Sequence, residues 1–388
     1  MEQAELYSRG FNPPETHRLW RDQILPRLVI PLFWVYWVAL LPARVLGAGA
    51  RHRNRGQEPQ VGIESGIIGW THVYFEELLG SAQDFFGSGH VYRQVIDRDQ
   101  PYYPQFAANQ RKSNANTVVL DVRTPGQNWP RSLAEGFRVA WNLNRRGITP
   151  IVVLTDAFRR RQRFQAAVLT VFHGCVVTFA HTDIAGTIFP HSRIRGPLFM
   201  PISRKRLTEL ELAKARFTAS RSLAAPLVIQ FIGSMYSPRD EFLQVVQEKL
   251  TEKGITLTIN SDKAGTSNDD YWRVLVESDI IFTTTLQGPT RRFMDWIWVR
   301  QAVFRYAETM AAGTALVAQC VDGGFPYFTK DSDYLEFEGV DQAVAGITAL
   351  VSDPDLRSRI AESGHATMAA YVEESIFWKD VMRCCQPD

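Results

Sequence analysis

Residues 227–242 read LVIQFIGSMYSPRDEF, and this stretch decides the fold class. An apolar run that favours a strand ends at Gly233, and Arg239 then opens a segment with the composition of a helix. A buried strand followed by a glycine turn and a helix is typical of a βαβ unit in a parallel sheet. Ligands of such sheets bind beyond the carboxyl ends of the strands, close to glycine backbone and helix N-termini. We therefore expect a binding site between Gly233 and Arg239.

Strand and helix signals alternate on both sides of this stretch. The predicted strands are 61–70, 117–122, 151–154, 175–180, 227–234, 256–260, 279–285 and 314–319. The predicted helices are 71–81, 131–146, 160–172, 239–253, 271–277, about 303–312, 341–368 and 375–382. A polar, basic stretch at 203–223 separates the two halves. This alternation predicts an α/β protein with two Rossmann-like, doubly wound domains.

The domain organisation follows from these signals and from an apolar run near the N-terminus. We expect a basic and hydrophobic segment at 1–56, a first Rossmann-like domain at 57–222, a second at 223–372 and a C-terminal helix at 373–388. A chain of 388 residues is long enough for two domains.

A second informative stretch, RYAETMAAGTALVAQ, spans residues 305–319. Glu308 lies one turn after Arg305 on a predicted helix that ends at Gly313, and Thr314 then opens an apolar strand. A carboxylate at this place can accept hydrogen bonds from both hydroxyls of a ribose, and glycine lets a ligand approach the backbone. The alternative is a surface Arg–Glu pair, which stabilises a helix by only about 0.2–0.5 kcal/mol.

These residues resemble the group-1 glycosyltransferases, including their spore-coat-protein-like branch. Residues 305–319 are similar to the nucleotide-sugar signature of that group, and residues 231–242 are similar to its phosphate-contacting segment. Residues 339–371 are similar to its C-terminal helical pair. The resemblance covers about 227–371 and implies a GT-B fold. It also implies that the second domain binds a nucleoside-diphosphate sugar and that the first holds the acceptor.

The resemblance implies a role for each matching residue. Glu308 would hold the ribose, while Arg239 and Arg305 would neutralise the diphosphate leaving group, whose charge grows in the transition state. Gly313 and Thr314 would line the same pocket, with Gly233 admitting the diphosphate to the backbone.

Two positions depart from the family pattern. Arg300 stands where many retaining members carry a second glutamate, and Ser234 stands where an arginine often follows the glycine. These departures keep a non-catalytic partner subunit open as an alternative.

The first domain offers two candidate catalytic residues. Asp156 follows a predicted strand and could act as a general base or orient the acceptor, or it could cap the next helix. His72 follows a glycine-containing turn and is either a second candidate base or a structural histidine.

Composition argues against several other classes of protein. A net charge of +2 gives no reason to expect nucleic-acid binding. The four cysteines have no zinc spacing and indicate reduced thiols in a cytoplasmic protein. The acidic triplets 331–333 and 353–355 could bind a metal, but the second is typical of a turn and a helix N-cap. We expect neither a metal nor a cofactor other than the nucleotide sugar as co-substrate.

The apolar run at 24–49 predicts attachment to the cytoplasmic face of a membrane. Its uncharged part is shorter than the ~20 residues that cross a bilayer, and arginines flank both ends. Phe33, Trp34 and Trp37 would insert into one leaflet. A buried core helix and a single span are the alternatives. A second aromatic and basic concentration at 286–301 is either core packing or an interfacial patch.

The function that these expectations favour is transfer of a sugar to a lipid-linked or cell-envelope polysaccharide acceptor at the membrane. A nucleotide-sugar epimerase on the same fold is a further alternative, although it has no need of a membrane segment.

Overall fold

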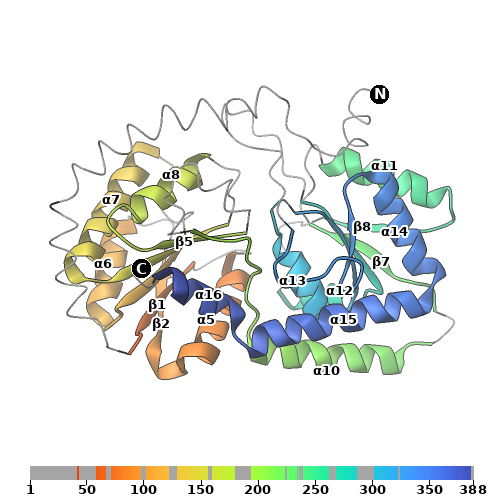
Figure 1. Ribbon diagram of the computed structural model, residues 1–388, viewed down its shortest axis with the longest axis horizontal. Coiled ribbons are helices and arrows are strands. Elements are labelled where there is room, and N and C mark those ends of the chain that lie inside the picture. The colour runs from red at the N-terminus through yellow and green to blue at the C-terminus, as the bar shows by residue number, and fades with distance from the viewer. Residues whose placement is uncertain are drawn as a thin grey trace. The chain divides into compact units, whose positions relative to one another are not determined.

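The computed structural model describes residues 58–66, 71–97, 102–121, 129–155, 160–179, 194–222, 225–233, 235, 239–261, 268–285, 301–321 and 324–385, together with Pro42. These residues form two compact units, each built on a parallel sheet (Figure 1). The N-terminal unit comprises the described residues of Pro13–Leu198 and Ser375–Asp388, and the C-terminal unit those of Phe199–Glu374. The predicted α/β fold with two Rossmann-like sheets is confirmed.

The N-terminal unit has a sheet with the strand order β2-β1-β3-β4-β5-β6, in which all neighbouring strands are parallel. Helices α6, α7 and α8 pack on one another on one face, and α5 and α16 lie on the other (Figure 1). Its strands are β1 (Val61–Gly66), β2 (Val91–Ile96), β3 (Thr117–Asp121), β4 (Thr149–Leu154), β5 (Cys175–Thr178) and β6 (Ile194–Arg195). Its helices are α5 (Thr71–Phe86), the 3-10 helix η2 (Ser88–His90), α6 (Tyr102–Lys112), α7 (Trp129–Arg146), α8 (Arg160–Leu169) and α16 (Ile376–Cys385).

The C-terminal helix α16 belongs to the N-terminal unit. Trp378 is 1% exposed, its Nε1 donates to Ser81 Oγ of α5 at 3.0 Å, and its ring lies 5.4 Å from that of Phe86. The sequence predicts this helix but not its partner, because an amphipathic helix does not reveal which distant apolar surface covers it.

The C-terminal unit has the strand order β11-β10-β9-β7-β8, again all parallel. Helices α11 and α14 pack together on one face, whereas α10, α12, α13 and α15 cover the other (Figure 1). The strands are β7 (Ile229–Ile232), β8 (Thr258–Asn260), β9 (Ile280–Thr283), β10 (Ala315–Gln319) and β11 (Leu335–Phe337). The helices are α10 (Arg204–Ser220), α11 (Arg239–Thr251), α12 (Asn268–Val276), α13 (Phe304–Ala311), α14 (Val340–Ser352) and α15 (Pro354–Glu373).

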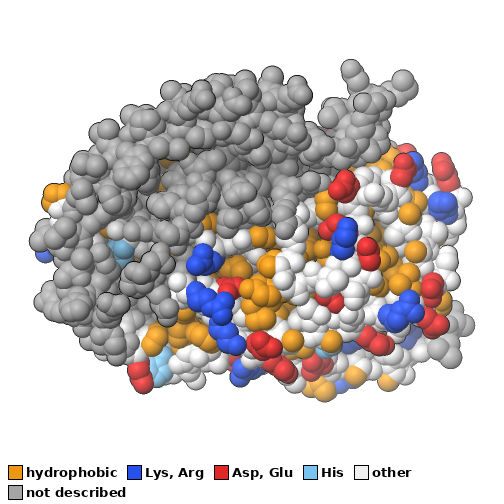
Figure 2. All heavy atoms as spheres, in the orientation of Figure 1, with side chains coloured by type: hydrophobic (Ala, Val, Ile, Leu, Met, Phe, Trp, Pro, Cys, Tyr) orange, Lys and Arg blue, Asp and Glu red, His pale blue; other side chains and the backbone are white. Residues whose placement is uncertain are grey.

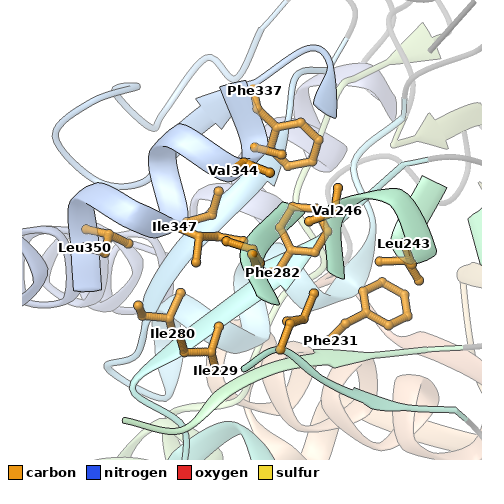
Figure 3. Close-up of a cluster of buried hydrophobic side chains, with 14 of the residues drawn as sticks. Ile229, Phe231, Leu243, Val246, Ile280, Phe282, Phe337, Val344, Ile347 and Leu350 are labelled. Carbon is orange, nitrogen blue, oxygen red and sulfur yellow. The ribbon is translucent and has the colours of Figure 1, made fainter. Parts of the chain in front are cut away.

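The main core of this unit lies between its sheet and helices α11 and α14 (Figure 3). Phe242 of α11, Phe282 of β9 and Phe337 of β11 stack with ring centroids 5.0–6.3 Å apart. Each of these rings is at most 1% exposed, so the apolar strands that the sequence shows are buried on this face. This packing fixes the strand ends that carry the candidate site.

The boundary between the units differs from the predicted one. It lies between Leu198 and Phe199 rather than at 222–223, because the stretch predicted to separate the halves forms helix α10. Leu207 and Leu210 of α10 are buried, and Lys214 Nζ donates to the carbonyl oxygens of Val276 and Ser278 at 3.0 and 2.9 Å. Lys214 thus binds carbonyl oxygens at the C-terminal end of α12. The sequence of α10 resembles a linker because the residues that it packs against are distant in the chain.

Two further differences concern short or interrupted elements. The edge strand β2 and helix α6 have weak sequence signals and were not predicted. The predicted helix 341–368 is broken at Asp353, whose side chain accepts a hydrogen bond from the N–H of Leu356 at 2.9 Å. The N-cap interpretation of the 353–355 triplet is therefore confirmed.

The predicted membrane segment lies outside the described residues except for Pro42, and this includes Phe33, Trp34 and Trp37. Among the helices that the structure describes, none is both long enough and apolar enough to cross a bilayer.

Lys214 should make the stability of the C-terminal unit depend on pH. Burial lowers its pKa from 10.5 to about 8, with Asp279 opposing the shift and Arg221 adding to it. Between these two values the unfolded chain binds more protons than the folded one, so the contribution of Lys214 to the free energy of unfolding rises with pH. In urea unfolding, the free energy of unfolding of wild type minus that of Lys214→Met should therefore increase from pH 8 to 10.5. The exposed Lys253→Met should give a flat difference, and a flat difference for Lys214→Met would contradict the prediction.

Candidate functional site

Two arginines meet one aromatic ring at the carboxyl end of β7. The guanidinium carbons of Arg305 and Arg239 lie 5.6 and 5.9 Å from the ring centroid of Phe231. Gly233 follows β7 with φ of +149°, and a Cβ atom at this position would lie only 2.6–2.9 Å from the guanidinium of Arg305. The glycine is therefore required twice, for its backbone conformation and for the close approach of the arginine.

The two cations come from helices on opposite faces of the sheet. Arg239 is the first residue of α11, and Arg305 is the second residue of α13. Both helices start at the carboxyl edge of the sheet, so their positive dipole ends accompany the two guanidinium groups. Arg239 is 2% exposed, and Arg305 Nε is buried with no hydrogen-bond partner among the described residues. This concentration of positive charge and donors is suited to an anion such as a diphosphate.

Glu308 lies one turn further along α13 and contacts α12. Its carboxylate accepts a hydrogen bond from the hydroxyl of Tyr271. Arg305 turns toward Gly233 and Phe231 instead of pairing with Glu308 on the helix surface. The alternative of a simple surface Arg–Glu pair therefore does not describe these residues. Glu308 is half-buried, and its carboxylate is a group that only accepts hydrogen bonds, with about four lone-pair sites.

Gln319 holds the surrounding strand ends together, and the sequence did not single it out. Its Oε1 accepts hydrogen bonds from Thr284 Oγ1 (2.6 Å), Thr285 N (2.9 Å) and Thr285 Oγ1 (3.0 Å) after β9. Its main-chain oxygen accepts from Tyr306 Oη at 2.6 Å. Burial raises the pKa of Tyr306, so the hydroxyl stays protonated as a donor. Because Tyr306 follows Arg305 directly, this network positions the start of α13.

Gly313 and Thr314 do not join this cluster. Gly313 ends α13 with φ of +62°, and Thr314 precedes β10. In the sheet register Ala315 pairs with Ile280, which also pairs with Ile229, so Thr314 lies at the opposite edge from Gly233. Strands rise about 3.3 Å per residue, which separates the two positions by roughly 15 Å along the strand direction.

The hydrogen bonds of Thr314 show that its role is structural. Its Oγ1 donates to the carbonyl oxygen of Leu275 at 2.8 Å and accepts from Lys214 Nζ at 2.9 Å. The expectation that Gly313 and Thr314 line the pocket beside Gly233 therefore does not fit the structure, which uses them to close the amino edge of the sheet.

The remaining candidates are less well defined by the structure. Asp156 lies outside the described residues, and His72 is the second residue of α5 with an undescribed side chain. Asp333 accepts hydrogen bonds from Thr329 N at 2.8 Å and Ser363 Oγ at 2.7 Å, so it closes a turn. Within the described ranges no cluster of three or more acidic, histidine or cysteine side chains could hold a metal. On the visible face the described acidic and basic side chains are mixed (Figure 2).

Comparison with known proteins agrees with this geometry. Residues 239–373 match a protein family described as glycosyl transferase-like. This segment contains Arg239, Arg305 and Glu308. The match lies within the C-terminal unit and covers less than half of the chain.

Several solved structures are similar to this chain at low sequence identity. Sucrose-phosphate synthase from Thermosynechococcus elongatus is 12% identical, with a TM-score of 0.50 over 83% of this chain and 98% of that one. HepE from Anabaena, solved with UDP-glucose, is 12% identical, with a TM-score of 0.48 over 82% of this chain and 98% of that one. WaaG, a glycosyltransferase involved in lipopolysaccharide biosynthesis, is 13% identical, with a TM-score of 0.44 over 82% and 99%. No curated protein sequence matches this chain significantly.

The contact between Gly233 and Arg305 can be tested by stability measurements. Gly233→Ala should lower the free energy of unfolding in urea by about 1–3 kcal/mol through backbone strain, and by more through the clash. Gly254→Ala is the matched control, because its φ is +72° but a Cβ there meets nothing within 4 Å. The double variant Gly233→Ala/Arg305→Ala should lose less free energy of unfolding than the two single variants lose together, because the smaller side chain at 305 removes the clash. Additive effects would show that the arginine does not lie against the glycine.

Proposed function

We propose that this protein transfers a sugar from a nucleoside-diphosphate sugar to a lipid-linked or cell-envelope polysaccharide acceptor. The observation that carries the donor part of this proposal is the pair of guanidinium groups around Phe231, at the end of the strand that Gly233 terminates. The acceptor part rests on the sequence at 24–49, whose apolar and basic character suits an enzyme that meets its acceptor at a membrane.

In this proposal the two arginines perform the main electrostatic work. When the glycosidic bond to the diphosphate breaks, negative charge accumulates on the leaving group. Arg239 and Arg305 are already in place beside Phe231, so they stabilise that charge without reorganisation. The proposal needs no metal ion for this step.

The other predicted residues complete the proposed reaction. The carboxylate of Glu308 accepts hydrogen bonds from the ribose hydroxyls, and the hydroxyl of Tyr271 orients that carboxylate. Asp156 and His72 remain the candidates for activating or orienting the acceptor. Product analysis with a panel of nucleotide sugars separates transfer from epimerisation, and it separates both from a subunit without turnover.

Nucleotide binding gives the most direct test of the donor site. Calorimetry with UDP, GDP, ADP and TDP should show saturable binding of at least one of them. Glu308→Ala should weaken that binding by more than about tenfold, which corresponds to about 1.4 kcal/mol. The exposed Glu252→Ala, on the same unit, should bind as wild type does. The assignment is wrong if wild type binds none of the four or if Glu308→Ala binds equally well.

Membrane attachment is tested by fractionation. The full-length chain should sediment with membranes and resist extraction by high salt, because apolar insertion is not screened by ions. A chain that lacks residues 1–56 should leave the membrane fraction and keep nucleotide binding. Extraction by salt alone would indicate a purely electrostatic attachment, and full-length protein in the supernatant would refute the anchor.

A further inference from the structure

The C-terminal unit contains a pocket that the proposed donor residues do not use. Its volume is about 710 Å³, within the usual ~300–1,000 Å³ for sites that bind small molecules. The pocket is lined by residues that follow β10, by residues of β11 and by the segment that joins the two strands. The lining runs from the carboxyl end of β10 to residues before and within β11, so its β10 side lies at the edge of the sheet that also carries Gly233.

Aromatic rings and a half-buried carboxylate give this pocket its chemical character. Phe325, Tyr327 and Phe328 supply apolar walls, while Glu336 supplies hydrogen-bond acceptors. The Glu336 side chain is 19% exposed, and its Oε2 accepts from Tyr334 Oη at 3.2 Å. Its Oε1 lies 3.8 Å from Lys330 Nζ, but the Lys330 side chain is 65% exposed and largely solvated. The carboxylate therefore keeps acceptor positions for a ligand.

The charges in this pocket contrast with those around Phe231. Glu336 and Glu338 outnumber the single cation Lys330 in the lining, so the pocket repels a second anionic group. Carboxylates bind hydroxyl donors well, and aromatic walls suit the apolar faces of a ring. These features fit an uncharged ring that carries several hydroxyl groups.

The pocket and the arginine cluster are connected through one side chain. The ring of Phe325 in the pocket wall lies edge-on to that of Tyr306, with centroids 5.4 Å apart, and Tyr306 follows Arg305 on α13. The end of β10 lies about 10 Å from the end of β7, because only β9 separates these two strands. Glu336 on β11 is one strand further away.

We propose that this pocket receives the glycosyl group of the sugar nucleotide and that Glu336 selects for it by binding its hydroxyl groups. This inference rests on the proposed function, since the diphosphate is held at Arg239 and Arg305. It adds a determinant of sugar specificity on β11, which makes neutral sugars better ligands than sugars with a carboxylate.

The test compares each nucleotide with its sugar conjugate in calorimetry on the full chain. The probes are UDP with UDP-glucose, GDP with GDP-mannose, and UDP-glucuronate. Glu336→Gln keeps the shape of the side chain and an acceptor for Tyr334. It should raise the Kd of the neutral nucleotide sugar about five- to tenfold and leave that of the parent diphosphate unchanged. Arg305→Gln should weaken binding of the diphosphate and of the nucleotide sugar to the same extent. Glu252→Gln should change neither affinity.

UDP-glucuronate adds a test by charge if the protein binds uridine nucleotides. Wild type should bind UDP-glucuronate more weakly than UDP-glucose. Glu336→Gln should bring the two Kd values closer together, because the substitution removes one negative charge that repels the glucuronate carboxylate. If wild type binds neither diphosphate, the proposed function and this inference both fail. If a diphosphate binds but Glu336→Gln changes nucleotide and nucleotide sugar equally, or changes only the KM for the acceptor, this inference alone is overturned.

Discussion

The guanidinium group of Arg305 lies within 2.6–2.9 Å of the place where a side chain at position 233 would have its Cβ atom. This constraint links the end of β7 to the start of α13, and the proposed donor chemistry depends on it. The ring of Phe231 supports the guanidinium from below, and the Gln319 network holds the ends of β9 and β10 around it. A fixed cation stabilises developing charge better than a mobile one because it needs no reorganisation during the reaction. The buried hydrogen bonds of Gln319 thus help to hold Arg305 in the position that the proposed electrostatic role requires.

The sequence was informative where local pattern alone decides structure. The stretch 227–242 placed a strand, a glycine turn and Arg239 at a helix start, and the structure has the same order because neighbouring residues determine each of these features. The grouping of Arg239 with Arg305 came from the family resemblance and not from spacing. The structure brings these two residues to the same ring although 66 positions separate them in the chain, because a parallel sheet aligns the carboxyl ends of its strands.

The same topology explains what the sequence did not reveal. Gly313 and Thr314 are near Arg305 in sequence, but helix α13 carries the chain from the carboxyl edge to the amino edge of the sheet. A contiguous run of residues can therefore serve two edges of the sheet, with Arg305 and Glu308 near one edge and the structural Thr314 at the other. Long-range contacts were equally hidden: the partners of Lys214 and Trp378 lie more than 60 and almost 300 positions away, respectively. Glu336 and Gln319 had no sequence signal, since a polar residue at a strand end acquires meaning only from its neighbours.

The distribution of charge in the C-terminal unit favours one orientation of a bound ligand. Near Phe231 the described side chains are cationic, whereas near Phe325 the pocket has two carboxylates and one exposed lysine. A molecule with an anionic diphosphate at one end and neutral hydroxyls at the other gains favourable contacts in only one orientation, since the reversed orientation brings phosphate against Glu336. Discrimination of this kind acts through repulsion of the wrong arrangement as much as through attraction of the right one. In the proposed reaction, that polarity directs the sugar toward β11 and the leaving group toward the arginines before any bond is broken.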